Sequence, residues 1–150
     1  MPITRLSPVL ARRQATWIVA MDPWKAMGYT AAPLGKYLYR KAKAGEVRAV
    51  LAGGEVRALM VLQPDFLLGS FIALLAVRPE AAGKGLGRAL LGRAEKETFA
   101  ARRWLYVSSD SQNTGAAQFY RKAGFRRAAT LSDMVRDGRV EWLWRKPKGD

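Results

Sequence analysis

In the first third of the chain, hydrophobic side chains recur at the spacing of an α-helix. Ser7 followed by Pro8 is typical of a helix start, because serine caps free N–H groups and proline fits the first helical position. The pattern predicts a helix over residues 8–21, which the sequence Asp22-Pro23-Trp24 ends. A second stripe predicts a helix that Thr30 caps and Gly45 ends. The residues on the two helical faces are Leu10, Gln14, Trp17, Ile18 and Met21, and then Leu34, Tyr37, Leu38 and Lys41.

From Glu46 onwards the pattern becomes that of β-strands. Residues 46–52 and 55–62 are two such runs, and the Gly53-Gly54 pair between them is a two-residue hairpin signal. Pro64-Asp65 then marks a predicted turn. Residues 69–77 form a further predicted strand, apolar enough to be buried on both faces.

Helices and strands alternate in the remaining sequence. A helix is predicted over residues 85–100, a strand over 104–108, a helix over 113–123, a strand over 125–130 and, after the turn at Asp137-Gly138, a strand over 140–145. In the last strand Trp142 and Trp144 alternate with Leu143, so we expect one face in the core and the other against a partner chain or a cleft. This order of elements indicates an α/β or α+β sheet with helices on both faces.

The composition limits the chemistry that this chain can perform. It has 150 residues, the size of one ordinary domain, so residues 1–150 are expected to form a single domain. Cysteine and histidine are both absent, which excludes disulfides, Cys/His metal sites, cysteine nucleophiles and imidazole-dependent triads. Acid–base chemistry is therefore left to Tyr, Asp, Glu, Lys, the backbone or water.

The formal net charge of +14 points to an anionic partner. Nucleic acid, an acidic membrane face and a phosphate-bearing small molecule all fit, and so does a merely solvated basic surface. The basic residues are spread along the chain, which argues against nucleic acid. The longest apolar run, residues 66–77, is too short for the roughly 20 residues that a bilayer requires, and the N-terminus has no secretory apolar region. We therefore expect a soluble, cytoplasmic protein without a membrane partner.

A glycine-rich segment follows the predicted strand 69–77. Glycines let backbone N–H groups approach a ligand, and the start of a helix adds partial positive charge, which Lys84 and Arg88 reinforce. This arrangement suits a pyrophosphate. The Walker A pattern fails because position 78 is arginine, and the Rossmann pattern fails because position 88 is arginine. The alternative is a turn that only lets the helix pack on the sheet.

A second motif covers the predicted helix 113–123. Asn113 is placed to cap this helix, Ala116, Phe119 and Tyr120 share a face, and Gly124 fits a left-handed C-terminal cap. The alternative is a small amphipathic helix with aromatic core residues.

Together the two motifs resemble the GNAT superfamily of acyl-CoA-dependent N-acyltransferases. The sequences Val77-x-Pro79 and Gly83-Lys84-Gly85-Leu86-Gly87 are similar to its pyrophosphate loop, and Asn113-x-x-Ala116-x-x-Phe119-Tyr120-x-x-x-Gly124-Phe125 is similar to its second cofactor motif. The order of elements from residue 2 to the C-terminus also fits. The resemblance implies a mixed, mostly antiparallel sheet of six to seven strands, acetyl-CoA (CoA) as cofactor and no metal. Where the family usually has Arg or Gln, this chain has Ala82.

The resemblance also implies roles for individual residues. Backbone groups of Leu75, Ala76 and Val77 would pair with the pantetheine arm, and the Val77 N–H would polarise the acetyl carbonyl. Asn113 would contact pantetheine, and Ala116, Phe119 and Lys122 would lie near the rest of CoA. Tyr120 would protonate the departing thiolate. The amides that would hold the pyrophosphate are those of Ala82, Gly83, Lys84, Gly85, Leu86, Gly87, Arg88 and Ala89.

The general base and the acceptor site are less well defined. The strand 69–77 has no titratable side chain, so the base is Glu141, Asp110 or a chain of waters; of the two carboxylates we select Glu141. In the family, the first two helices roof the acceptor cleft, so Trp24 and Tyr29 in the connecting segment are candidates for lining it. Packing of Trp24 in the core is the alternative.

The sequence thus predicts an N-acetyltransferase that moves an acetyl group from acetyl-CoA to a primary amine by direct attack in a ternary complex. The acceptor would be a small-molecule or peptide amine. The alternatives are an acyl-CoA-binding sensor that performs no transfer and a basic nucleic-acid-binding module. Homodimers are frequent in the family, and the sequence leaves the oligomeric state open.

Overall fold

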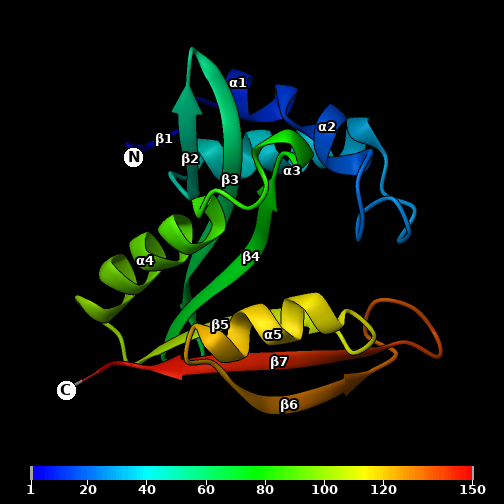
Figure 1. Cartoon of the computed structure of the whole chain (residues 1–150), viewed down its shortest axis with the longest axis vertical. Coiled ribbons are helices and arrows are strands. Elements are labelled where there is room, and N and C mark those ends of the chain that lie inside the picture. Colours follow the sequence, from blue (N-terminus) through cyan, green and yellow to red (C-terminus); the bar gives the residue numbers. More distant parts are fainter. Residues whose placement is uncertain (1, 150) are drawn as a thin grey trace. The chain divides into compact units, whose positions relative to one another are not determined.

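The computed structural model describes residues 2–149, in which seven strands form one mixed sheet accompanied by helices (Figure 1). The strand order is β1-β2-β3-β4-β5-β7-β6. The pairs β1–β2, β2–β3, β5–β7 and β6–β7 are antiparallel, whereas β4–β5 is parallel. The predicted fold class is therefore confirmed. Chain contacts divide the molecule into two compact units, Met1–Leu62 with Leu74–Arg93 and Gln63–Ala73 with Ala94–Asp150.

The first unit contains the N-terminal helices and the first three strands, of which the third continues into the second unit. Helix α3 packs against α1 and α2, and the side chains of Ile18 and Leu38 are fully buried there. Gly53 and Gly54, both with positive φ, close the predicted hairpin between β2 and β3. The elements are β1 (Ile3–Arg5), α1 (Pro8–Arg13), α2 (Ala15–Val19), α3 (Ala31–Lys43), β2 (Val47–Ala52) and β3 (Glu55–Phe66).

The single helix predicted over residues 8–21 is wrong, because the chain forms two helices that meet at Gln14. The backbone N–H of Gln14 bonds to the carbonyl of Ala11, three residues back, at 3.0 Å. Its buried side chain donates to the Leu10 carbonyl and accepts from the Trp17 indole, each at 2.8 Å. A side chain that bonds to nearby backbone competes with the regular helical ladder, which accounts for the break. The Ser7 cap is confirmed, whereas Thr30 precedes α3 without a side-chain capping bond.

The predicted turn at Pro64-Asp65 is also wrong. Strand β3 continues to Phe66, and the chain reverses at Leu67 and Leu68 before β4 (Gly69–Val77) begins. Both leucines have positive φ, as does Asp65. Leucine disfavours this conformation, so the sequence carries no turn signal at the true position.

The second unit is built around β5 (Trp104–Asp110), which pairs with β4 on one side and β7 (Val140–Pro147) on the other. Helix α5 (Thr114–Lys122) and the edge strand β6 (Arg126–Ser132) complete it, and Figure 1 shows β6 beside β7. The pairing of β4 with β5 runs from Gly69–Trp104 to Ile72–Val107. In the last strand Trp144 is 1% exposed and donates to the Ser109 hydroxyl, while Leu143 on the opposite face is 9% exposed, so both faces are buried at these two positions.

Gly69 gives a test of how closely β4 and β5 approach. A Cβ atom at this position would lie 2.1 Å from the backbone oxygen of Trp104, and backbone cannot move aside as a flexible side chain can. We expect Gly69→Ala to lower the free energy of unfolding by about 1–3 kcal/mol or more, measured by urea denaturation. Gly92→Ala is the matched control. Gly92 lies in the interior of a helix with open space around it, so Gly92→Ala should raise the free energy of unfolding by about 0.5–1 kcal/mol. Equal stability of the two variants would contradict the close approach.

Candidate active site

The glycine-rich loop connects β4 to helix α4 (Leu86–Phe99) through a short 3₁₀ turn, η1 (Pro79–Ala81). Ala81 and Leu86 are buried at its two ends and anchor it. Between them Gly83 and Gly85 have φ of 76° and 80°, a region that only glycine adopts without strain. The first bond of the helix runs from the N–H of Ala89 to the carbonyl of Gly85 at 3.0 Å. The loop therefore has fixed ends and a left-handed backbone between them.

The space over this loop is open and electropositive. A Cβ atom on Gly83 or Gly85 would meet nothing within 4 Å. The first N–H groups of an α-helix have no acceptor within the helix, so those at the start of α4 are available to an anion. Lys84 and Arg88 are exposed, and neither forms an ion pair with any of residues 2–149. These residues fit a pyrophosphate, as the sequence predicts, and the buried anchors show that the loop also serves packing.

Arg78 supports the candidate loop, a role that the sequence analysis missed. Its backbone N–H bonds to the Arg57 carbonyl at 2.9 Å, and its guanidinium donates to the Val56 carbonyl at 2.6 Å. The same guanidinium lies 3.3 Å from a carboxylate oxygen of Glu55 and 4.9 Å from the ring centre of Trp17. These contacts hold the entrance of the loop. The available signal was a charged residue directly after an apolar strand.

The three β4 residues expected to contact pantetheine lie just before the loop. Ala76 is buried, whereas Leu75 and Val77 are half-buried. They belong to the first unit, together with the loop. The three residues therefore lie in the same unit as the loop and directly precede it.

Helix α5 carries the second motif. The Oδ1 atom of Asn113 accepts a hydrogen bond from the N–H of Ala116 at 3.1 Å, so the predicted cap is confirmed. Gly124 follows the helix with φ of 97°, as predicted for its C-terminal end. Of the three helix residues expected near the cofactor, Ala116 and Phe119 are half-buried and Lys122 is exposed to solvent. The side-chain NH₂ group of Asn113 remains as a donor for a ligand.

Tyr120 is the buried titratable group of this helix, with 8% of its surface exposed. Its ring makes edge-to-face contacts with Phe119 and Phe125, with centroids 5.4 and 5.7 Å apart. Burial, and after it the negative charge of Glu141, raise the pKa of Tyr120 from 10.0 to about 12. The hydroxyl therefore keeps its proton throughout the neutral pH range.

Two carboxylates lie opposite one another where β5 pairs with β7, and their surroundings differ. Asp110 accepts two bonds from the Arg139 guanidinium, at 2.8 and 3.0 Å, and one from the N–H of Gln112 at 2.8 Å. Burial raises the pKa of Asp110, but these bonds outweigh it and leave the pKa below its usual 3.8. Burial raises the pKa of Glu141, and the charge of Asp110 adds to this, against the lowering effects of the Ser108 hydroxyl and Arg139. Glu141 is thus the better proton acceptor, and Asp110 is engaged in structural bonds.

The two residues proposed for the acceptor site lie between α2 and α3. Trp24 is half-buried and Tyr29 is 45% exposed. The Asp22 carboxylate accepts from the N–H of Ala26 at 3.1 Å, and the N–H of Tyr29 bonds to the Trp24 carbonyl at 3.0 Å, which orders this segment. Both residues belong to the first unit, whereas Tyr120 and Glu141 belong to the second.

Residues 2–149 contain no group of three acidic, histidine or cysteine side chains arranged to hold a metal ion. Within the same residues, no helix is long and apolar enough to cross a bilayer.

Comparisons with known proteins agree with this geometry. A family model described as an acetyltransferase (GNAT) domain matches residues 34–127. A GNAT-family acetyltransferase from Bacillus cereus superposes with a TM-score of 0.79 at 14% identity, covering 99% of this chain and 98% of that one. An aminoglycoside 6'-N-acetyltransferase complexed with coenzyme A superposes with a TM-score of 0.80 at 15% identity, and the match covers 100% of this chain and 98% of that one. The ribosomal-protein-alanine N-acetyltransferase from Brucella melitensis has a TM-score of 0.76 at 17% identity, and the match covers 98% of this chain and 99% of that one. These likenesses show a shared fold, and a search of curated proteins finds no match.

Proposed function

The chain belongs to the GNAT acetyltransferase family, and we propose that it moves an acetyl group from acetyl-CoA to a primary amine. The observation that carries this proposal is the open loop of positive-φ glycines at the start of α4, which suits a pyrophosphate. The structure of a similar fold complexed with coenzyme A supports the same cofactor class. The reported relatives are acetyltransferases, and they lend no support to a sensor or a nucleic-acid-binding module.

Binding is proposed to rest mainly on the backbone. The N–H groups of residues 82–89 hold the pyrophosphate, with Lys84 and Arg88 adding positive charge. Backbone groups of Leu75 to Val77 and the amide of Asn113 hold the pantetheine arm. Ala116, Phe119 and Lys122 line the rest of the cofactor. Because the loop uses backbone donors, Ala82 in place of the family's Arg or Gln removes a side chain but leaves the cradle.

The transfer itself requires one bond to form and one to break. The amine nitrogen bonds to the acetyl carbon, the carbon–sulfur bond breaks, one proton leaves the nitrogen and one proton reaches the sulfur. Coenzyme A supplies the acetyl group as an activated thioester. The Val77 N–H is proposed to polarise the acetyl carbonyl, and Trp24 and Tyr29 to line the acceptor side.

Glu141 and Tyr120 are proposed to move the two protons. Glu141 accepts the proton of the amine, and its raised pKa makes it a stronger base than an ordinary carboxylate. Accepting this proton also neutralises Glu141. The charge that helps to raise the pKa of Tyr120 is thereby removed when the sulfur needs a proton. Tyr120 therefore becomes a better acid in the same step in which Glu141 acts as base.

Replacement of Tyr120 tests the proposed proton donor. We expect Tyr120→Phe to lower kcat by about 10²–10⁴-fold, measured as thiol release, because the sulfur loses its acid. Affinity for CoA, measured by calorimetry, should stay unchanged. Tyr106→Phe is the control, since Tyr106 is also buried but its hydroxyl bonds to the Leu67 carbonyl. A Tyr120→Phe enzyme that turns over like the Tyr106→Phe enzyme would refute the role of Tyr120.

The facing carboxylates give a matched pair for testing the base. On the acid side, kcat/KM of the wild type should fall as Glu141 becomes protonated, with an apparent pKa above the usual 4.5. Glu141→Gln should abolish this acid limb and lower kcat by about 10²-fold or more. Asp110→Asn should keep the limb but shift it to lower pH, because a negative charge beside Glu141 is removed and Arg139 is released. If Glu141→Gln keeps both the wild-type kcat and the fall of kcat/KM at low pH, a chain of waters would be the base instead.

A further inference from the structure

The turn between β3 and β4 carries the two most exposed of the large hydrophobic side chains in residues 2–149. Leu67 is 63% exposed and Leu68 is 78% exposed. Both occupy the left-handed region, with φ of 46° and 61°. A two-residue hairpin of this kind favours Asn-Gly, which would be less strained and better hydrated. Leucine at both positions strains the backbone and exposes apolar surface to water, which points to a role other than stabilising the fold.

This turn belongs to the second unit, and hydrogen bonds within that unit fix its backbone. The Tyr106 hydroxyl donates to the Leu67 carbonyl at 3.0 Å, and the N–H of Arg103 donates to the Leu68 carbonyl at 3.3 Å. The ring of Phe66, the residue before the turn, stacks on Phe71 at 4.8 Å and contacts the ring of Tyr106 at 5.1 Å. The leucine side chains are therefore presented to solvent by a fixed backbone.

Six basic residues lie at the same end of the sheet as the two leucines, and we call them the cationic collar. They lie where β5 begins, β7 ends and β6 begins: Trp104 pairs with Pro147, the N–H of Lys148 bonds to the Arg103 carbonyl, and Arg126 faces Arg145. The collar consists of Arg102, Arg103, Arg126, Arg145, Lys146 and Lys148. Asp65 pairs with Arg102, and Glu95 pairs with Lys146. Among residues 2–149 the other four have no carboxylate partner, and Arg145 lies over the ring of Trp104 at 3.9 Å.

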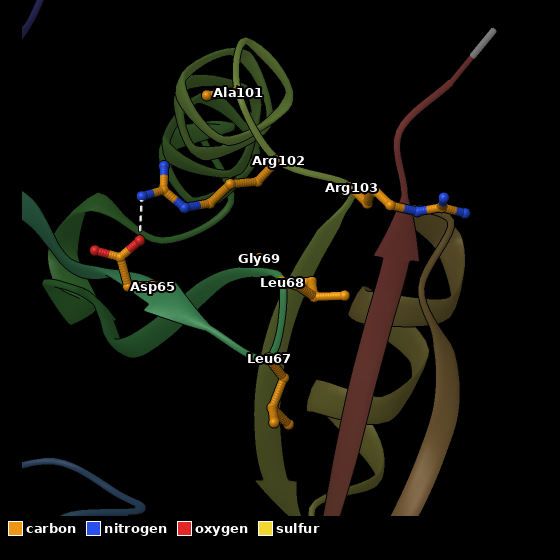
Figure 2. A pocket seen from close by; sticks show the side chains of 7 residues that line it. All are labelled: Asp65, Leu67, Leu68, Gly69, Ala101, Arg102 and Arg103. Atoms are coloured by element: carbon orange, nitrogen blue, oxygen red, sulfur yellow. Dashed lines mark hydrogen bonds and ion pairs between the residues drawn. The ribbon is translucent and has the colours of Figure 1, made fainter.

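A hollow of about 560 Å³ lies between the turn and the segment that precedes β5. Figure 2 shows Arg102 turned towards Asp65, while Arg103 points away from that ion pair. The walls combine the apolar Leu67, Leu68 and Ala101 with Asp65 and the two arginines. Asp65 is paired with Arg102, which leaves the charge of Arg103 uncompensated among the described residues. An anionic headgroup attached to an apolar chain matches this lining.

We infer that the Leu67-Leu68 turn docks the protein on the surface of an anionic lipid bilayer. The leucines would enter the interfacial layer, and the cationic collar would contact lipid phosphates. A second copy of the chain carries the same positive charge, which opposes self-association through this patch. Nucleic acid would favour exposed aromatic rings, whereas the exposed residues here are aliphatic. A contact with the bilayer surface needs no membrane-spanning segment, so the short apolar runs of this chain are compatible with it.

Vesicle sedimentation tests this proposal with the intact protein. We expect binding to phosphatidylcholine vesicles that contain about one-third phosphatidylglycerol, and none to phosphatidylcholine alone. The double variant Leu67→Asn/Leu68→Gly should keep or raise Tm, because its turn is the favoured one, yet lose binding by about tenfold or more. The matched control is Met134→Ser/Val135→Ser, which removes two other exposed apolar side chains and should bind like the wild type.

Charge reversal separates local docking from general attraction of a basic protein. Arg103→Glu should weaken binding by about tenfold or more, whereas Lys36→Glu, at an exposed position on α3, should change it much less. Equal losses in these two variants would overturn the proposal, as would unchanged binding of Leu67→Asn/Leu68→Gly. Absence of binding to anionic vesicles would overturn it as well, and would leave a protein partner as the occupant to seek.

Discussion

The passage from β4 to α4 depends on two backbone conformations that glycine adopts freely and other residues adopt only with strain. With Gly83 and Gly85 in the left-handed region, the chain reverses without side chains over its outer face. The conformation is stabilised from both ends, by burial of Ala81 and Leu86 and by the contacts of Arg78. Packing beneath the loop therefore permits an open, electropositive surface above it. The proposed cofactor site follows from that division.

Proton chemistry in this chain is constrained by the absence of histidine and cysteine. No side chain has an ordinary pKa near neutrality, so the pKa values of the available groups must be moved by their surroundings. Burial raises the pKa of both Glu141 and Tyr120, which makes Glu141 a stronger base and keeps Tyr120 protonated until the charge of Glu141 is neutralised. Their electrostatic coupling links the two proton transfers. Asp110, one strand away from Glu141, shows how the same side-chain type becomes structural when an arginine holds it.

Local signals in the sequence predicted much of the fold. Ser7-Pro8, the Gly53-Gly54 hairpin and the cap at Asn113 depend on neighbouring residues, and all three form as predicted. The break at Gln14 was missed because it depends on where a buried amide finds its partners. The turn at Leu67 was missed because leucine is a poor residue for that conformation.

The candidate site was predictable to a similar extent. Its loop and helix were found because their residues are close in sequence and their glycines and caps have characteristic spacings. Glu141 was selected over Asp110 from the sequence, but the physical reason for that choice lies in the cross-strand pairing and the Arg139 guanidinium, which sequence does not reveal. Arg78 was overlooked because its partners, such as Val56 and Trp17, are distant along the chain.

Calorimetric titration with acetyl-CoA at low and at moderate salt tests the central claim most directly. The account predicts saturable binding with one site per chain that weakens with salt but persists, because backbone N–H groups supply much of the contact. Loss of all binding at moderate salt would mean that only the general positive charge attracts the ligand. Absence of binding at both salt concentrations would contradict the assignment of the Gly83–Gly85 loop as a pyrophosphate site.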